Sequence, residues 1–132
     1  MILVDTSVLI DYFKGKDNNP SSNLQFILDA GIPFGISSFI YQELMQGAKT
    51  EKEFYELKAY LESQTFYELR DSKTSYEAAA LIYFKCRKKG VQVGSTIDCL
   101  VAQTAIENNL YLLHNDRDFE KIAKVVKLKL YT

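Results

Sequence analysis

Short apolar runs alternate along the chain with longer stretches in which apolar residues recur at helical spacing. Residues 2–4 and 110–113 are continuous apolar runs bounded by polar residues, which is typical of strands buried on both faces of a sheet. Shorter runs predict three further strands, at residues 33–36, 65–69 and 125–126. Strands that alternate with helices favour an α/β fold, and we expect a three-layer α/β/α sandwich with a mainly parallel central sheet.

The segments between these strands carry helical signals. Gly, Asn, Pro and Ser residues mark their ends, and apolar residues recur at helical intervals within them. The longest segment closes with the basic run 85–89, a place where positive side chains also suit the dipole of a helix. The predicted helices cover residues 8–13, 21–31, 37–48, 50–63 and 72–90, and two more start near Ser95 and Asp118.

The composition is that of an ordinary folded domain. The chain has 132 residues, of which 47% are hydrophobic and 25% charged, so we expect a single domain over residues 1–132 with a substantial core. The net charge of −1 lacks the basic excess common among nucleic-acid-binding domains, so any RNA contact must rely on local patches. No run approaches the roughly 18 apolar residues of a membrane span, and the N-terminus does not resemble a signal peptide, which predicts a cytoplasmic protein.

Two cysteines, Cys86 and Cys99, are too few and too far apart for a zinc knuckle. Nothing marks a secreted scaffold held by disulfides. We therefore predict two buried thiols in a reducing compartment.

Four acidic positions stand where predicted strands end or where the next helices begin. They are Asp5, Glu43, Asp98 and the pair Asp116 with Asp118. Each has a structural explanation as well. Asp5 or Asp116 is suited to cap the next helix, and Asp98 completes a capping-box pattern with Ser95. Glu43 shares a helical face with apolar neighbours, where an uncompensated carboxylate is costly to desolvate.

In a parallel sheet, Asp5 and Asp116 would follow the ends of their strands at the same edge of the sheet. The helices that carry Glu43 and Asp98 would start at that edge too. Carboxylates that converge without a cation repel one another, so the arrangement suits a bound divalent ion. The oxygen ligands favour Mg²⁺, with Mn²⁺ as a substitute, and His114 and the separated cysteines offer no soft ligand set. The corresponding chemistry is phosphoryl transfer or phosphodiester hydrolysis, with one metal or two.

The order of these motifs is also informative. The chain contains Val4-Asp5-Thr6-Ser7, then Ser37-Ser38-Phe39 leading to Glu43-Leu44 with Gly47 beyond, then Asp98 at the start of an alanine-containing helix, and finally Asn115-Asp116-Arg117-Asp118-Phe119. Together, and over essentially the whole chain, they resemble PIN-domain ribonucleases and, more narrowly, the VapC-type toxins of toxin–antitoxin systems. The resemblance implies a metal-dependent endoribonuclease that cleaves RNA, has an α/β/α sandwich, is usually a homodimer and is neutralised by a small VapB-type antitoxin.

The resemblance also implies roles for the acidic residues. Asp5 and Asp98 would be the principal metal ligands, and Asp116 would complete the metal shell. Glu43 would help to position metal-bound water. Family members place their last acid at either position of the Asp-x-Asp-Phe segment; we favour Asp116, with Asp118 assisting or capping.

Other polar residues have weaker assignments. Thr6 and Asn115 match positions that hydrogen-bond the acidic site in the family. The candidates for contact with RNA phosphates are Arg117, Lys85, Lys88 and Lys14. Such contacts position a nucleic acid without reading its sequence, so the RNA target is left open.

Several other functions fit the sequence less well. A haloacid-dehalogenase-type phosphotransferase needs a second aspartate two residues after the first, where this chain has Ser7. A Toprim-type nuclease or primase core leaves Asp5 and Asp98 unexplained, and a receiver-like signalling module needs paired acids and a late lysine. Two alternatives stay open, a PIN nuclease in RNA processing and a metal-binding module without catalysis. The intact carboxylate set favours the nuclease.

Overall fold

The computed structural model describes residues 1–132 and is built on a five-stranded sheet in which every neighbouring pair is parallel. The strands are β1 (Ile2–Val4), β2 (Phe34–Ile36), β3 (Thr65–Phe66), β4 (Tyr111–Leu113) and β5 (Lys129–Leu130), in the order β3-β2-β1-β4-β5. The central strand β1 is buried along its whole length, as its unbroken apolar run predicts.

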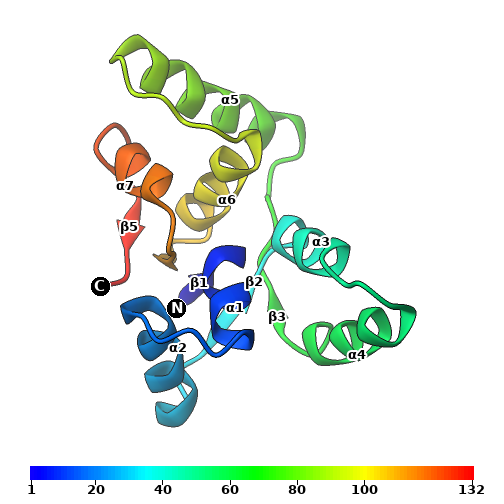
Figure 1. Ribbon diagram of the computed structural model, residues 1–132. Coiled ribbons are helices and arrows are strands. Elements are labelled where there is room, and N and C mark those ends of the chain that lie inside the picture. The colour runs from blue at the N-terminus through cyan, green and yellow to red at the C-terminus, as the bar shows by residue number, and fades with distance from the viewer.

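Seven helices connect the strands: α1 (Thr6–Phe13), α2 (Asn19–Ala30), α3 (Ser38–Gln46), α4 (Glu51–Leu61), α5 (Lys73–Lys88), α6 (Thr96–Glu107) and α7 (Arg117–Ala123). Crossovers between parallel strands are right-handed, so those that run from β1 towards β3 lie on one face of the sheet, and those that lead to β4 and β5 lie on the other. Figure 1 shows α5, α6 and α7 gathered together on one side. The three-layer α/β/α sandwich is confirmed.

Side-chain caps fix where the helices start. The Asn18 side chain accepts a hydrogen bond from the Ser21 N–H, and Pro20 lies in the first turn, so α2 begins at Asn19 rather than at Ser21. Ser95 caps α6 by accepting from the Ile97 N–H, 3.1 Å away. The predicted capping box is therefore wrong, because Asp98 takes no part in the cap and its carboxyl group is free for another role.

The strand predicted at residues 125–126 is also wrong. The N–H groups of Val125 and Val126 both donate to the Ile122 carbonyl, so these residues form the turn that ends α7. The edge strand β5 follows it and pairs with β4, with Lys129 opposite Tyr111. The sequence Lys127-Leu128-Lys129-Leu130 alternates polar and apolar residues, which is the pattern of a half-buried strand.

The core lies between the sheet and the two helical layers. Cys86 and Cys99 are both buried and unpaired, as predicted. At Gly35 a side chain would lie 2.6 Å from the Thr65 carbonyl and the Tyr67 ring, so only glycine lets β3 approach β2 this closely. None of the seven helices has the length and apolar character needed to cross a bilayer.

Candidate active site

The acidic residues meet where two neighbouring strands end. The strand order runs from β1 to β2 and β3 in one direction and from β1 to β4 and β5 in the other, which makes the gap between β1 and β4 a topological switch point. In open parallel sheets, ligands bind just outside the carboxyl ends of the strands at such a point. Asp5 follows β1 there, and its N–H still pairs with the Leu113 carbonyl of β4 at 3.0 Å.

Asp5 is buried, with 5% of its surface exposed. Its Oδ2 atom accepts two hydrogen bonds, from the Ser7 N–H at 3.1 Å and from the Ser7 hydroxyl at 2.7 Å. Asp5 is thus the N-cap of α1, and its charge also helps to raise the pKa of Asp98. Burial raises the pKa of Asp5, and the bonds from Ser7 oppose that rise.

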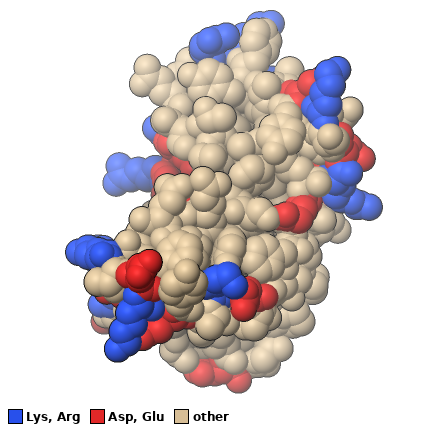
Figure 2. Space-filling model, turned by 90° about the vertical axis from the view of Figure 1, so that its right-hand side faces the viewer, with Lys and Arg blue, Asp and Glu red and all other residues tan.

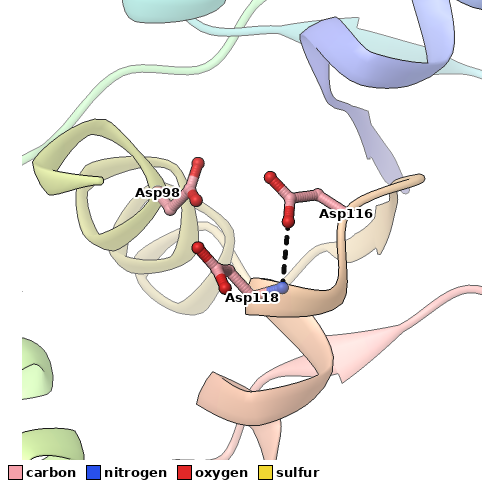
Figure 3. Close-up of side chains that lie close together, drawn as sticks. All are labelled: Asp98, Asp116 and Asp118. Carbon is pink, nitrogen blue, oxygen red and sulfur yellow. Dashed lines mark hydrogen bonds between the residues drawn. The ribbon is translucent and has the colours of Figure 1, made fainter. Parts of the chain in front are cut away.

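Three further carboxyl groups form a compact cluster. One oxygen each from Asp98, Asp116 and Asp118 lie within 4.8 Å of one another. Asp98 stands in the first turn of α6, Asp116 is the N-cap of α7 and Asp118 is in the first turn of α7. Figure 3 shows all three side chains pointing into the space between these two helix ends.

The members of this cluster differ in their hydrogen bonds. Asp118 Oδ2 accepts from the Gly94 N–H at 2.9 Å, and its Oδ1 lies 3.5 Å from the Lys121 ammonium group. Asp116 Oδ1 accepts from the Asp118 N–H at 2.9 Å, the dashed line in Figure 3. Asp98 has no hydrogen-bond or ion-pair partner. Its burial, followed by repulsion from Asp116 and the other acids, raises the pKa of Asp98 to about 7.

Glu43 completes the set from α3. The Thr6 hydroxyl donates to Glu43 Oε1 at 3.0 Å, as the resemblance implies for Thr6. Glu43 is exposed and borders an open groove, so the desolvation that its apolar helical face predicts is only partial. Partial shielding of its carboxyl group from water, together with the charge of Asp5, still raises the pKa of Glu43.

A family model described as the PIN domain matches residues 2–125. The chain belongs to the PIN-domain family. Among its relatives are the VapC ribonuclease Mb1587 of Mycobacterium bovis and the ribonuclease VapC11 of Mycobacterium tuberculosis. Each is 28% identical over 130 residues, which cover 98% of this chain and 96% of the relative.

Solved structures have the same fold. VapBC2 from Rickettsia felis, bound to a DNA fragment of its promoter, aligns with a TM-score of 0.74 at 22% identity, over 99% of this chain and 98% of that one. FitAcB from Neisseria gonorrhoeae aligns with a TM-score of 0.72 at 19% identity, over 100% of this chain and 97% of that one. A toxin–antitoxin complex from Klebsiella pneumoniae gives 0.69 at 24%, over 96% of each chain. At these identities the likeness concerns the fold alone.

PIN nucleases depend on divalent metal ions, and the acids of this PIN domain fit such an ion. Both carboxylate oxygens of Asp98 lack a hydrogen-bond partner. Asp116 and Glu43 each have one carboxylate oxygen without a partner. All of these donors are hard carboxylate oxygens, which suit a cation of the Mg²⁺ or Mn²⁺ type. A cation among them would also offset the repulsion that raises the pKa of Asp98.

The structure changes the role expected of Asn115 in this PIN domain. Its side-chain amide donates to Asp11 Oδ2 at 2.8 Å and to none of the acidic site residues. Its backbone N–H donates to the Ser7 hydroxyl at 3.0 Å, and that hydroxyl bonds Asp5. No role at the site was predicted for Ser7 or Asp11. They stand four residues apart on α1, and this spacing, which places them on one face, is the signal that was available.

His114 is a third residue whose role was not predicted. Its Nδ1 atom accepts a hydrogen bond from the Asp116 N–H at 3.1 Å, and its ring packs on Phe119 with the centroids 5.4 Å apart. Burial lowers the pKa of His114, which favours the neutral ring that can accept this bond. His114 therefore holds the backbone of the loop that carries Asp116.

The four basic candidates for RNA contact are all exposed, but the structure brings only two of them to the site. Lys14 lines the same groove as Glu43, and Arg117 borders a cavity with Asp116. Lys85 and Lys88 lie in the last turn of α5 without an ion-pair partner. On the face that carries α3 and α4, basic and acidic side chains are mixed around a broad uncharged area, with no continuous basic surface (Figure 2).

Proposed function

We propose that residues 1–132 form a cytoplasmic endoribonuclease that acts as the toxin of a type II toxin–antitoxin pair. Membership of the PIN family, the VapC ribonucleases among its relatives and the acidic site support this function. The observation that carries it is Asp98, whose carboxyl group accepts no hydrogen bond and is repelled by four other acidic side chains, two of which lie within 4.8 Å. Such an arrangement destabilises the folded protein, and carboxyl groups with perturbed pKa values of this kind are typical of functional sites. Binding a cation would explain why the arrangement is present.

The cofactor we propose is Mg²⁺, with Mn²⁺ as a substitute. Asp5, Asp98 and Asp116 would hold it, because Asp118 already uses both of its oxygens on Gly94 and Lys121. Such an ion supplies a nucleophile at neutral pH and neutralises the charge that develops on the phosphate.

The remaining residues orient the site and move protons. Glu43 has one oxygen fixed by Thr6 and one free, so it is placed to accept a proton from the attacking water. Ser7 fixes Asp5, and Asp118 donates its N–H to Asp116. Arg117 and Lys14 would contact the phosphates that neighbour the cleaved one.

The antitoxin that we propose as partner would bind the groove between α1, α3 and α4. This groove has a volume of about 520 Å³ and reaches Glu43 at one end. Phe13 and Tyr60 line it with their rings 5.6 Å apart, and both are exposed. Apolar side chains of a VapB-type segment would cover them. Phe13→Asp should abolish binding of the antitoxin encoded next to this gene and leave RNA cleavage intact.

We further propose a homodimer formed through α5. Tyr76, Tyr83 and Phe84 expose their rings on this helix, an unusual concentration of apolar surface for a monomer. Analytical ultracentrifugation should find a dimer for the wild type and a monomer for Tyr83→Asp. A monomeric wild type would contradict the proposal.

The nuclease function is tested by mapping cleavage of total cellular RNA with Mg²⁺. We expect cleavage at a small number of sites by the wild type and by Asp71→Asn, a control in which an exposed aspartate outside the site loses its charge. Asp5→Asn and Asp98→Asn should cleave nothing. Equal cleavage by wild type and Asp98→Asn, or cleavage that persists in EDTA, would show that the metal site is not the catalytic centre.

A further inference from the structure

Asp11 ties together two segments that lie far apart in the sequence. Its Oδ2 atom accepts from the side-chain amide of Asn18 at 3.1 Å and from that of Asn115 at 2.8 Å. Asn18 is the cap of α2, and Asn115 directly precedes Asp116. One carboxylate therefore fixes the start of α2 relative to the loop between β4 and α7.

Both segments line a polar cavity of about 690 Å³. Asn19 and Asn23 line it from α2, and Asp116 and Arg117 line it from the loop. Figure 1 shows the start of α2 close to the end of the chain. Tyr131, near that end, also lines the cavity. Because Asp116 borders both the acidic cluster and this cavity, a molecule in the cavity adjoins the proposed point of cleavage.

The side chains of the cavity have unused hydrogen-bonding capacity. Asn19 and Asn23 stand one helical turn apart, and neither amide has a partner in the structure. Asp116 uses the Nδ1 atom of His114, so the Nε2 atom of the neutral ring is left as a donor. The cavity thus offers donors and acceptors together with the planar ring of Tyr131.

This lining suits a nucleobase better than a phosphate. Two acidic residues, Glu120 and Asp116, line the cavity with one basic residue, Arg117. The charge of the cavity lining therefore does not favour an anion. Proteins read unpaired RNA bases with amide and hydroxyl groups on the base edges and with rings that stack on the base. The volume is also within the range of about 300–1,000 Å³ that is usual for small-molecule sites.

We propose that this cavity, between α2 and the β4–α7 loop, binds the base of an RNA nucleotide next to the cleaved phosphate, and that Asp11 holds its two walls in place. The proposal rests on the proposed ribonuclease function only for the identity of the ligand. Asn19 and Asn23 read the base edge, Tyr131 stacks on the base, and Arg117 contacts the adjoining phosphate.

A binding experiment separates this proposal from catalysis. Full-length ¹⁵N-labelled Asp98→Asn protein is titrated with AMP, CMP, GMP and UMP, and the side-chain amide signals are followed by NMR. We expect saturable shifts of the Asn19 and Asn23 amides, larger for one base than for the others. Equal shifts for all four nucleotides and for ribose 5-phosphate, or no shifts at Asn19 and Asn23, would overturn the base-binding role, whether or not the wild type cleaves RNA.

Steady-state cleavage of a short RNA gives an independent test. Asn23→Leu should raise KM about tenfold, the effect of losing one hydrogen bond of the bound base, and change kcat little. Gln25→Leu is the matched control, because Gln25 is on the same helix but outside the cavity, and its KM should equal that of the wild type. An unchanged KM for Asn23→Leu contradicts the proposal.

The role of Asp11 is tested with two substitutions. Asp11→Leu removes the acceptor for both asparagines and should weaken the nucleotide-induced shifts. Asp11→Asn keeps an oxygen that can accept both bonds and should retain them. If Asp11→Leu binds nucleotides as the wild type does, Asp11 does not hold the cavity; a thermal melt confirms that each variant is folded.

Discussion

The two sides of the acidic site differ in the hydrogen bonds that their carboxyl groups accept. On the α1 side, Asp5 accepts two hydrogen bonds from Ser7, and Glu43 accepts one from Thr6. On the side of α6 and α7, Asp98 accepts no hydrogen bond, and two other aspartates lie within 4.8 Å of it. The first side is a rigid frame that fixes where its oxygens point. The second holds excess negative charge, which is the feature that attracts a cation.

The comparison also explains why the pKa values rise for different reasons. For Asp5, burial dominates and hydrogen bonds oppose it, so this carboxyl group is stabilised by the protein itself. For Asp98, burial and repulsion act in the same direction and no hydrogen bond opposes them, which raises the pKa to about 7. The charge of Asp98 is therefore balanced by a proton or by a bound cation and not by a protein group, so the two sides should respond differently to mutation.

The largest expected effect is that of Asp98→Asn. Removing this carboxylate should lower RNA cleavage by about 1,000-fold, at the upper end of losses from deleting one preorganised charge-stabilising group. The same substitution should stabilise the protein in EDTA by about 1 kcal/mol after allowance for solvent screening, because it removes an uncompensated charge. Cleavage assays and urea unfolding of the same preparation measure both. A loss of stability without metal would contradict the excess-charge account.

Ser7→Ala should have the next largest effect. The substitution removes the hydroxyl that donates to Asp5 and accepts from the Asn115 N–H. The segments after β1 and β4 therefore each lose a hydrogen bond that holds them in place. Losses of this kind at groups that orient metal ligands are about 10- to 100-fold in metal affinity. Titration calorimetry with Mn²⁺ measures the change. Ser7→Thr keeps the hydroxyl and is the control; if it binds as weakly as Ser7→Ala, the hydrogen bonds are not the cause.

Thr6→Val should have a smaller effect. It keeps the shape of the side chain but removes the hydrogen bond to Glu43, so we expect about a tenfold drop in kcat. The affinity for the metal should change little, because Glu43 is not one of the three proposed metal ligands. Single-turnover cleavage at saturating Mg²⁺ measures the rate. Retention of the full rate would remove Glu43 from the proton-transfer step.

The smallest effect is on stability as a function of pH. The pKa of Asp98 is about 7 in the folded protein, against 3.8 for an unperturbed aspartate, so between these pH values the folded state binds a proton that the unfolded state has released. The free energy of unfolding in EDTA should therefore fall as the pH rises through 7, and Asp5 and Glu43 act in the same direction.

The measurement should run from about pH 6.5 to about pH 8, because His114, whose pKa is lowered from 6.5, has the opposite effect at lower pH. The fall should be smaller in Asp98→Asn, and Asp71→Asn should behave as the wild type. Equal pH dependence in wild type and Asp98→Asn would mean that Asp98 titrates normally.

Much of this site could be predicted from the sequence, because its frame depends on local patterns. The apolar runs at residues 2–4 and 110–113 mark two parallel strands, and parallel strands bring their carboxyl ends to one edge. That argument locates Asp5 and Asp116 without side-chain detail. The edge strand β5 was missed because Val125 and Val126 are the more apolar pair, although they lie in the turn after α7.

The hydrogen bonds could not be predicted in the same way. Asn115 turns its amide to Asp11 because of the path of the loop after β4, and no periodic pattern encodes that path. The isolation of Asp98 depends likewise on what its neighbours do: Ser95 bonds Ile97, and Asp118 is held by Gly94. Spacing predicts which residues meet, whereas the partners of each oxygen follow only from the folded loops.

We propose that Asp98 is an uncompensated carboxyl group that a divalent cation neutralises. Titration calorimetry with Mg²⁺ at pH 7, in two buffers of different ionisation enthalpy, measures the protons released on binding. With a pKa of about 7 for Asp98, binding should release about half a proton in the wild type and almost none in Asp98→Asn. Binding without proton release, or equal release in both proteins, would contradict the account.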